Sequence, residues 1–323
     1  MINQQKNLKS VLATVVHLEG SSYRKPGVRM LINEYGAMTG AVSGGCVEKE
    51  VVRRAKSVFT DGKAKVIAYD GRYRLGCEGT LYILIEPFII SENFSQAFIQ
   101  NLELRMPFKI ASYYRKSDEV FGKFGSVVHF KNGDSFSFEK EIDQSLQFFS
   151  QELQPLFRLI ILGGEHDAVA LCKMASSLGW QVEVVTSMND PKQLADFPGA
   201  HAVTGQSPET VSFDNHFDHT AIIIMNHSYV QDLRYLVKLC NQQVKYVGIL
   251  GAANRRERLF NELFDFAPEV SEDFLESIYT PAGLNIGAQT PEEIALSILA
   301  EIQMVVKDKD PFSLRKVTGR IDV

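Results

Sequence analysis

Short runs of apolar residues, each bounded by glycine, proline or polar residues, dominate the first half of the chain. The runs are rich in valine, isoleucine and tyrosine, which favours β-strands. A further stretch, residues 125–138, is centred on Asn132-Gly133, a dipeptide typical of a tight hairpin. Strands are expected at residues 11–18, 30–36, 64–70, 80–90 and 109–115, and a helix at 94–104. This half predicts an N-terminal α+β domain.

One stretch of the same half, residues 40–59, has a helical period instead. Its apolar residues recur every three or four positions, which places them on one face of a helix. They are Val47, Val51, Val52, Ala55, Val58 and Phe59. Ser43 is the expected N-cap, because a serine hydroxyl can accept a hydrogen bond from a peptide N–H of the first turn. Gly44, Gly45 and Cys46 then begin the helix.

After about residue 150 the pattern changes to buried strands that alternate with amphipathic helices. Strands are expected at residues 159–164, 181–186, 200–205, 220–228 and 246–252, and helices at 165–180, 232–242, 254–264 and 291–307. This alternation predicts a Rossmann-like, doubly wound parallel sheet. The polar segment 140–156, which contains Pro155, separates the two patterns. We therefore expect an α/β protein with domains at 1–150 and 151–323.

Composition is that of a soluble globular protein. Of the 323 residues, 45% are apolar and 23% charged, and the formal net charge is −5. No overall basic excess points to nucleic acid or to an anionic membrane surface. No apolar run reaches the roughly 20 residues of a membrane span, and the first residues lack a signal-peptide pattern. The 4 cysteines are too few for a disulfide scaffold, so a cytoplasmic location is expected.

Two cysteines of the first half lie where they could be reactive. Cys46 begins a helix, whose unpaired N–H groups lower the pKa of a thiol and also bind anions. Cys77 lies in a glycine-containing loop before a strand, and Arg24 and Arg29 would add positive charge if their loop covers the helix start. A cofactor ligand and a nucleophilic thiol, with His17 or Glu48 as the candidate base, remain open. A small buried side chain at Cys46 remains open too.

The loop after the first strand of the second half only partly matches a dinucleotide-binding fingerprint. Gly163 and Gly164 are present, but Glu165 takes the place of the second fingerprint glycine, where a backbone would approach a pyrophosphate. The acidic residue expected after the second strand, for the ribose, is also missing. An NAD(P)-dependent oxidoreductase or an NADP-regulated protein is therefore retained only as an alternative function.

Three charged or titratable residues follow strands of the expected parallel sheet. His166 and His227 follow two of these strands, and Arg255 begins a helix after a third. Ligands of doubly wound sheets bind at the carboxyl ends of the strands, so these side chains are candidate ligand contacts. Solvated loop residues are the alternative. Cys172 and Cys240 lie among apolar helix residues and are expected in the core.

Several blocks of the sequence resemble the xanthine dehydrogenase accessory family, XdhC/CoxI. In the first half these blocks are residues 13–51 and "GCEGTLYILIEP", residues 76–87. In the second half they are "LIILGGEHDAVALCKMASSLGW", "NHSYVQDLRYL", "YVGILGAANRRERL" and "IYTPAGLNIGAQTPEEIALSILAEI". The blocks occur in the family's order and cover nearly the whole chain, with residues 90–150 the weakest part.

The resemblance implies a non-enzymatic maturation factor that binds the molybdenum cofactor and transfers it to an apo molybdoenzyme of the xanthine or carbon monoxide dehydrogenase type. It also implies that the protein helps to install the cofactor's terminal sulfur, with a cysteine desulfurase as a further partner. A homodimer is expected as well. The family's Gly-Gly-Cys-x-Glu segment maps onto Gly44, Gly45, Cys46 and Glu48, and its second cysteine loop onto Cys77. As soft ligands, both thiolates would suit molybdenum or a sulfur atom.

The chain departs from the family pattern mainly after the strands of the second half. Glu165 interrupts the glycine-rich loop before His166, Asn226 precedes His227, and Asn285 follows Gly283-Leu284. These departures put nucleotide binding by the second domain in question. The Gly-Gly-Cys-x-Glu segment is intact, although Glu78 follows Cys77 where glycine is expected.

Overall fold

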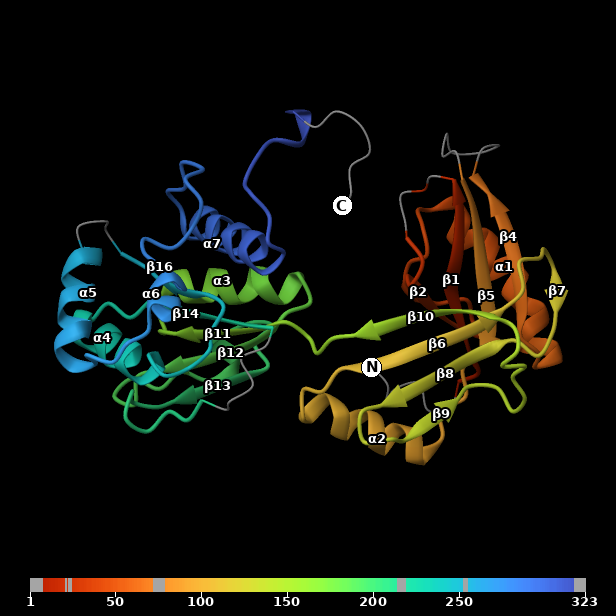
Figure 1. Cartoon of the computed structure of the whole chain (residues 1–323), viewed down its shortest axis with the longest axis horizontal. Coiled ribbons are helices and arrows are strands. Elements are labelled where there is room, and N and C mark those ends of the chain that lie inside the picture. Colours follow the sequence, from red (N-terminus) through yellow and green to blue (C-terminus); the bar gives the residue numbers. More distant parts are fainter. Residues whose placement is uncertain are drawn as a thin grey trace. The chain divides into compact units, whose positions relative to one another are not determined.

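The computed structural model describes residues 8–20, 22, 25–71, 79–213, 219–251 and 255–316. The chain divides into two compact units, Met1–Pro155 and Leu156–Val323. Their elements are labelled in Figure 1. Within the described residues, the first unit combines antiparallel sheets with helices α1 and α2, and the second has a parallel six-stranded sheet, so the predicted α/β fold class is confirmed.

The first unit is built on an antiparallel sheet with the strand order β3-β2-β1-β5-β4-β7. Its strands are β1 (Ser10–Gly20), β2 (Arg29–Asn33), β3 (Met38–Gly40), β4 (Lys65–Asp70), β5 (Gly79–Pro87) and β7 (Val120–Phe121). Because side chains alternate across a strand, the central strands present one apolar row to each face. This sheet therefore has two buried faces.

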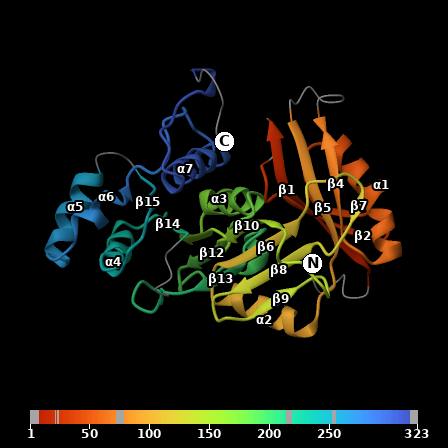
Figure 2. The same cartoon turned by 45° about the vertical axis from the view of Figure 1, so that its right-hand side comes forward.

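Helix α1 (Cys46–Asp61) covers one face of this sheet, as Figure 1 and Figure 2 show. The predicted apolar stripe of the helix packs there against alternate residues of β1, β2 and β5. Val47, Val51, Ala55 and Val58 are each at most 1% exposed. The 40–59 segment is thus a helix with the predicted buried face.

A second antiparallel sheet packs on the opposite face, with the strand order β10-β6-β8-β9. Its strands are β6 (Phe108–Tyr114), β8 (Gly125–Phe130), β9 (Ser135–Ser137) and β10 (Gln147–Leu153), and helix α2 (Glu92–Glu103) lies against it. The predicted hairpin joins β8 to β9 through Gly133, which has a φ of 97°. Strand β10 lies within the polar segment 140–156 and pairs with β6.

A buried carboxyl group links the two sheets. Glu86 of β5 is 0% exposed, and its carboxylate oxygens accept hydrogen bonds from the Ser126 N–H (2.7 Å) and from Ser126 Oγ (2.5 Å). Ser126 Oγ also shares a 2.7 Å hydrogen bond with Ser112 Oγ. Burial raises the pKa of Glu86 to about 7. A titratable group therefore lies in the core of this unit.

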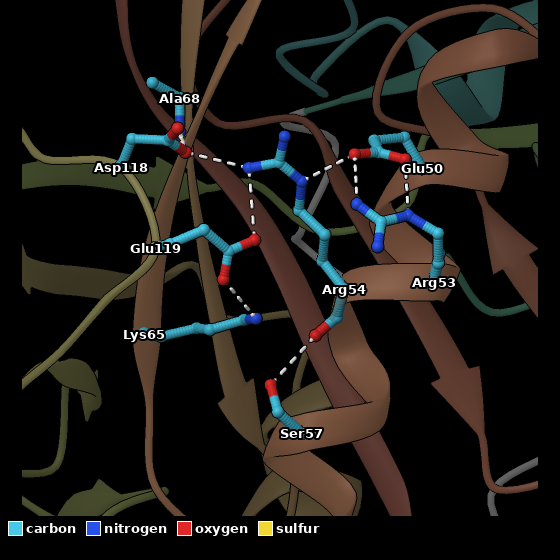
Figure 3. A network of polar contacts seen from close by, with 8 residues as sticks. All are labelled: Glu50, Arg53, Arg54, Ser57, Lys65, Ala68, Asp118 and Glu119. Atoms are coloured by element: carbon cyan, nitrogen blue, oxygen red, sulfur yellow. Dashed lines mark hydrogen bonds and ion pairs between the residues drawn. The ribbon is translucent and has the colours of Figure 1, made fainter.

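A network of charged side chains, drawn in Figure 3, ties α1 to the strands beside it. The Arg54 guanidinium lies 2.7 Å from Glu50, 2.8 Å from Asp118 and 3.2 Å from Glu119. Glu119 also pairs with Lys65 of β4 at 2.9 Å. Arg54 thus connects the helix to the segment that enters β7.

Substitution of Arg54 by methionine is expected to lower the unfolding free energy of this unit by about 1 kcal/mol, since the guanidinium of Arg54 loses its pairs with three carboxylates. The effect stays small because Glu50 keeps Arg53 and Glu119 keeps Lys65. Arg53→Met is the matched control, because the Arg53 side chain is 65% exposed and that of Arg54 only 17%. Urea denaturation, followed by pulse-labelled hydrogen exchange in α1 and β4, measures the unfolding free energy of both variants. Equal losses for the two variants would contradict the assigned role of Arg54.

The second unit contains a parallel sheet with the strand order β13-β12-β11-β14-β15-β16. Its strands are β11 (Arg158–Leu162), β12 (Gln181–Thr186), β13 (Ala202–Gly205), β14 (Thr220–Ile224), β15 (Val247–Ile249) and β16 (Ile278–Tyr279). Strands are added outward from β11 on one side and from β14 on the other, and this reversal of strand order is that of a Rossmann fold. The predicted doubly wound sheet is confirmed.

Helices cover both faces of this parallel sheet. On one face lie α3 (His166–Ser177) and α7 (Pro291–Val306), and on the other α4 (Tyr229–Leu239), α5 (Arg255–Phe266) and α6 (Glu272–Glu276). The 3-10 turns are Leu194–Asp196 and Leu314–Lys316. Pro291 opens α7 as predicted, and Thr290 is its N-cap. Among the residues that the structure describes, no helix is long and apolar enough to cross a membrane.

Candidate functional site

The start of α1 has no side-chain cap. The N-cap is Gly45, with φ 50° and ψ −69°, and Cys46 is the first helical residue. The prediction that Ser43 is the N-cap is therefore wrong, since the helix begins two residues later than Ser43 would require. Without a side-chain cap, the peptide N–H groups of the first turn stay available to an anion.

The two glycines before the helix leave its start open. A Cβ atom built on Gly44 or on Gly45 would meet no atom within 4 Å, and both residues are exposed. The positive φ of Gly45 is in the region that favours glycine. The Gly-Gly pair thus supplies both the backbone conformation and the space for a group to approach the helix start.

Glu48, on the first turn of α1, folds back toward this start. Its Oε1 accepts a hydrogen bond from the Ser43 N–H at 2.7 Å. The side chain is nevertheless buried, with an exposed fraction of 7%. Its other carboxylate oxygen, Oε2, is buried without a hydrogen-bond partner. This hydrogen bond holds the Glu48 carboxyl group against the backbone that precedes the helix, next to Gly44 and Gly45.

The other predicted residues of the first unit do not all join this turn. Arg29 belongs to the row of β2 that faces the second sheet, since its neighbour Met30 packs on the α1 side. Its Nη1 donates to Gly27 O (2.9 Å) and to Gln151 Oε1 (2.6 Å). Arg24, Cys77 and the side chain of Cys46 lie outside the described part of the structure.

In the second unit, the two loop glycines are explained by the fold. A Cβ atom on Gly163, which has a φ of 150°, would lie 2.6 Å from the carbonyl oxygen of Met225 at the end of β14. A Cβ atom on Gly164 would lie 3.3 Å from Thr186 Cγ2. Gly163 is thus needed where two neighbouring strands end, so its presence does not by itself point to a pyrophosphate.

The two predicted histidines follow neighbouring strands. His166 begins α3 after β11, and His227 follows β14, which pairs with β11 in register. Both side chains are exposed. The parallel sheet therefore places both at its carboxyl edge, the usual ligand-binding edge of this architecture.

Arg255 is already paired within the protein. Its Nη2 donates to Asp232 Oδ2 at 2.7 Å, and its guanidinium lies 5.1 Å from the ring centroid of Tyr229. Asp232 is 0% exposed, also accepts a hydrogen bond from Asn226, and has a pKa raised to about 6 by burial. This ion pair joins α4 to the start of α5, and it was not predicted, because no local pattern connects residues 23 positions apart.

The cysteines of the second unit are structural. Cys172 and Cys240 are free and buried, as predicted, and burial raises the pKa of Cys172 to about 11. Such a thiol stays protonated and unreactive at neutral pH. Within the described residues, no group of three or more histidine, cysteine or acidic side chains could hold a metal ion.

Comparison with known proteins decides the family. A model described as the XdhC and CoxI family matches residues 4–70, and one described as the XdhC Rossmann domain matches residues 159–302. A relative from Bacillus subtilis, named as a probable xanthine dehydrogenase subunit, is 30% identical over an alignment of 314 positions, and the match covers 91% of this chain and 92% of the relative. This chain belongs to the XdhC and CoxI family. The predicted family is thereby confirmed.

Two further family relatives bear on fold and role. A relative from Escherichia coli, named molybdenum cofactor insertion chaperone PaoD, is 23% identical over 301 residues, covering 92% of this chain and 83% of PaoD. A crystal structure described as a xanthine dehydrogenase from Bacillus halodurans matches with a TM-score of 0.76 and 26% identity, covering 94% of this chain and 93% of that one. The XdhC fold thus extends over both units.

Proposed function

We propose that this chain is an insertion chaperone that binds the molybdenum cofactor and delivers it to an apo molybdoenzyme of the xanthine dehydrogenase type. One observation carries the proposal: the first turn of α1 is uncapped and open at Gly44 and Gly45. Free N–H groups at a helix start bind anionic oxygens, and the cofactor carries a phosphate. Membership of the family and the name of the PaoD relative support the same role.

The proposed site belongs to the first unit, with Ser43, Gly44, Gly45, Cys46 and Glu48 around the helix start and Arg24 and Cys77 contributing from loops. As thiolates, Cys46 and Cys77 would be soft ligands for molybdenum, or would hold the sulfur that becomes its terminal ligand. Sulfuration of the cofactor, a cysteine desulfurase partner, a homodimer and a cytoplasmic location complete the proposal. These parts rest on the family resemblance.

The alternative function, an NAD(P)-dependent oxidoreductase, has less support from the second unit than the chaperone has from the first. The fold itself requires Gly163, and Glu165 is the exposed N-cap of α3, where a pyrophosphate would meet its negative charge. We therefore assign no hydride-transfer role to the exposed residues His166 and His227. They remain proposed contacts for the cofactor or its recipient.

The proposal predicts what copurifies with the protein. Purified from a host that makes molybdopterin, the wild type should carry molybdopterin, measured as its fluorescent oxidation product. Cys46→Ala should reduce the occupancy roughly tenfold, corresponding to about 1.4 kcal/mol of lost binding free energy. Cys240→Ala is the matched control, because this thiol is buried in the second unit. A wild type without molybdopterin, or equal occupancy in Cys46→Ala, would refute the cysteine site.

A further inference from the structure

The carboxylate of Glu48 is only half used by the fold. A glutamate in the first turn of a helix commonly reaches back to a peptide N–H before the helix, and Oε1 does so by accepting from Ser43. That contact explains the position of the side chain and its burial. It leaves Oε2 without a hydrogen-bond donor. Water cannot easily supply one, because the side chain is only 7% exposed.

An unpaired oxygen of a buried carboxylate is costly. Leaving a buried acceptor unsatisfied typically destabilises a protein by about 1–3 kcal/mol, and by more for a charged group. Nearly all buried polar atoms in native proteins have a partner, so an unpaired one raises the question of which group supplies it. Because the carboxyl group is held at the turn 43–45, its free oxygen belongs to the same helix start that is open at Gly44 and Gly45.

The two parts of this site require opposite partners. The uncapped N–H groups of the first turn are donors and favour an anion. The free oxygen of Glu48 is an acceptor with negative charge, so it repels an anion and requires an N–H or O–H group. A ligand that satisfies both must carry an anionic group and, apart from it, a hydrogen-bond donor.

We propose that Glu48 Oε2 accepts a hydrogen bond from the N–H edge of the cofactor's pterin ring, while the first-turn N–H groups of α1 hold an anionic group of the same molecule. The inference rests on the proposed function and assigns a recognition role within that site. A pterin presents its 2-amino group and the adjacent ring N–H side by side, a donor pair that a carboxylate matches. Glu48 then selects for the pterin, and Cys46 is left for the metal and sulfur.

Two fluorescent probes test this role on the full chain: unsubstituted pterin, and lumazine, in which a carbonyl replaces the 2-amino group. The wild type should bind the pterin at least tenfold more tightly than lumazine, since a hydrogen bond to a charged group is worth about 1.5–3 kcal/mol. Glu48→Gln should weaken pterin binding by about tenfold and reduce the preference over lumazine to less than about threefold. A role limited to helix capping would leave that preference unchanged.

Glu50→Gln is the matched control, because this neighbouring acid on α1 bonds to Arg53 and Arg54. It should keep the wild-type preference for the pterin. A wild type that binds the two probes equally or binds neither, or a Glu48→Gln variant with unchanged preference, would overturn the inference. The first of these needs no variant and so does not depend on how Glu48→Gln folds.

The result of the pterin and lumazine test can be separated from the result of the copurification test of the proposed function. Molybdopterin that copurifies with the wild type, together with equal binding of pterin and lumazine, would uphold the chaperone and reject the role of Glu48. A preference for the pterin without copurified molybdopterin would uphold Glu48 as a pterin contact and reject the chaperone.

Discussion

Glu86→Gln is expected to remove most of the pH dependence of the first unit's stability between about pH 4.5 and pH 7. The carboxyl of Glu86 lies between two sheets, and its burial raises its pKa from 4.5 to about 7. Arg29 opposes this rise through its positive charge, and the charge of Glu139 adds to it. Glutamine keeps the shape and can still bond to both groups of Ser126, but it does not titrate.

The sign of the effect follows from proton binding. Between pH 4.5 and 7 the unfolded chain has lost the Glu86 proton and the folded chain still holds it, so the unfolding free energy falls as the pH rises. A difference of 2.5 pKa units corresponds to about 3 kcal/mol, fully lost above pH 7. Glu86→Gln should therefore be more stable than the wild type at pH 8, and the difference should shrink toward pH 4.5.

Urea denaturation at pH 5, 6, 7 and 8 measures this, with unfolding of the first unit followed by pulse-labelled hydrogen exchange in β1 and β5. Glu103→Gln, an exposed acid on α2, is the matched control and should follow the wild-type curve. Parallel curves for wild type and Glu86→Gln would show that the carboxyl does not titrate in this range.

Gly163→Ala is expected to destabilise the second unit by roughly 3 kcal/mol or more, combining backbone strain with a steric clash. The new Cβ would lie 2.6 Å from the Met225 carbonyl oxygen, and the φ of 150° is one that residues with side chains rarely adopt. Since β11 and β14 are central and paired, neither strand can move away without losing ladder hydrogen bonds.

The single tryptophan makes this measurement specific to the second unit. Trp180 packs against Phe157 with ring centroids 4.5 Å apart, so its fluorescence in urea reports unfolding there. Gly287→Ala is the matched control, because Gly287 has a φ of 79° but nothing within 4 Å of a built Cβ. It should cost only about 1 kcal/mol. Equal losses for the two variants would mean that the Met225 contact does not explain this glycine.

The sequence predicted the fold because its signals were periodic. The apolar stripe from Val47 to Val58 gave α1 and its buried face, and the strand–helix alternation after residue 158 gave the parallel sheet. Strand β10 was not predicted, because its residues 147–153 form an edge strand and lack the alternation of a half-buried strand. Edge strands carry a weaker pattern than central ones.

The geometry of the candidate site follows from the sequence where neighbouring residues form it, and follows less well where the topology does. Ser43 to Glu48 lie on one turn, so their proximity follows from sequence spacing. The face of the sheet on which Arg29 lies is set by the alternation of side chains along β2. Met30 and Ile32 pack on the α1 side, so Arg29 lies on the other face. The pair of Asp232 and Arg255 forms only when helices α4 and α5 pack side by side.

Transfer of the cofactor tests the central claim most directly. Protein loaded with the molybdenum cofactor in the cell is mixed with the apo form of a xanthine dehydrogenase-type molybdoenzyme, and the two are then separated and assayed. We predict that the molybdenum cofactor moves to the enzyme and that hydroxylase activity appears in proportion, while protein purified as Cys46→Ala transfers little. Cofactor that stays on the loaded chain, with no gain of enzyme activity, would contradict an insertion chaperone.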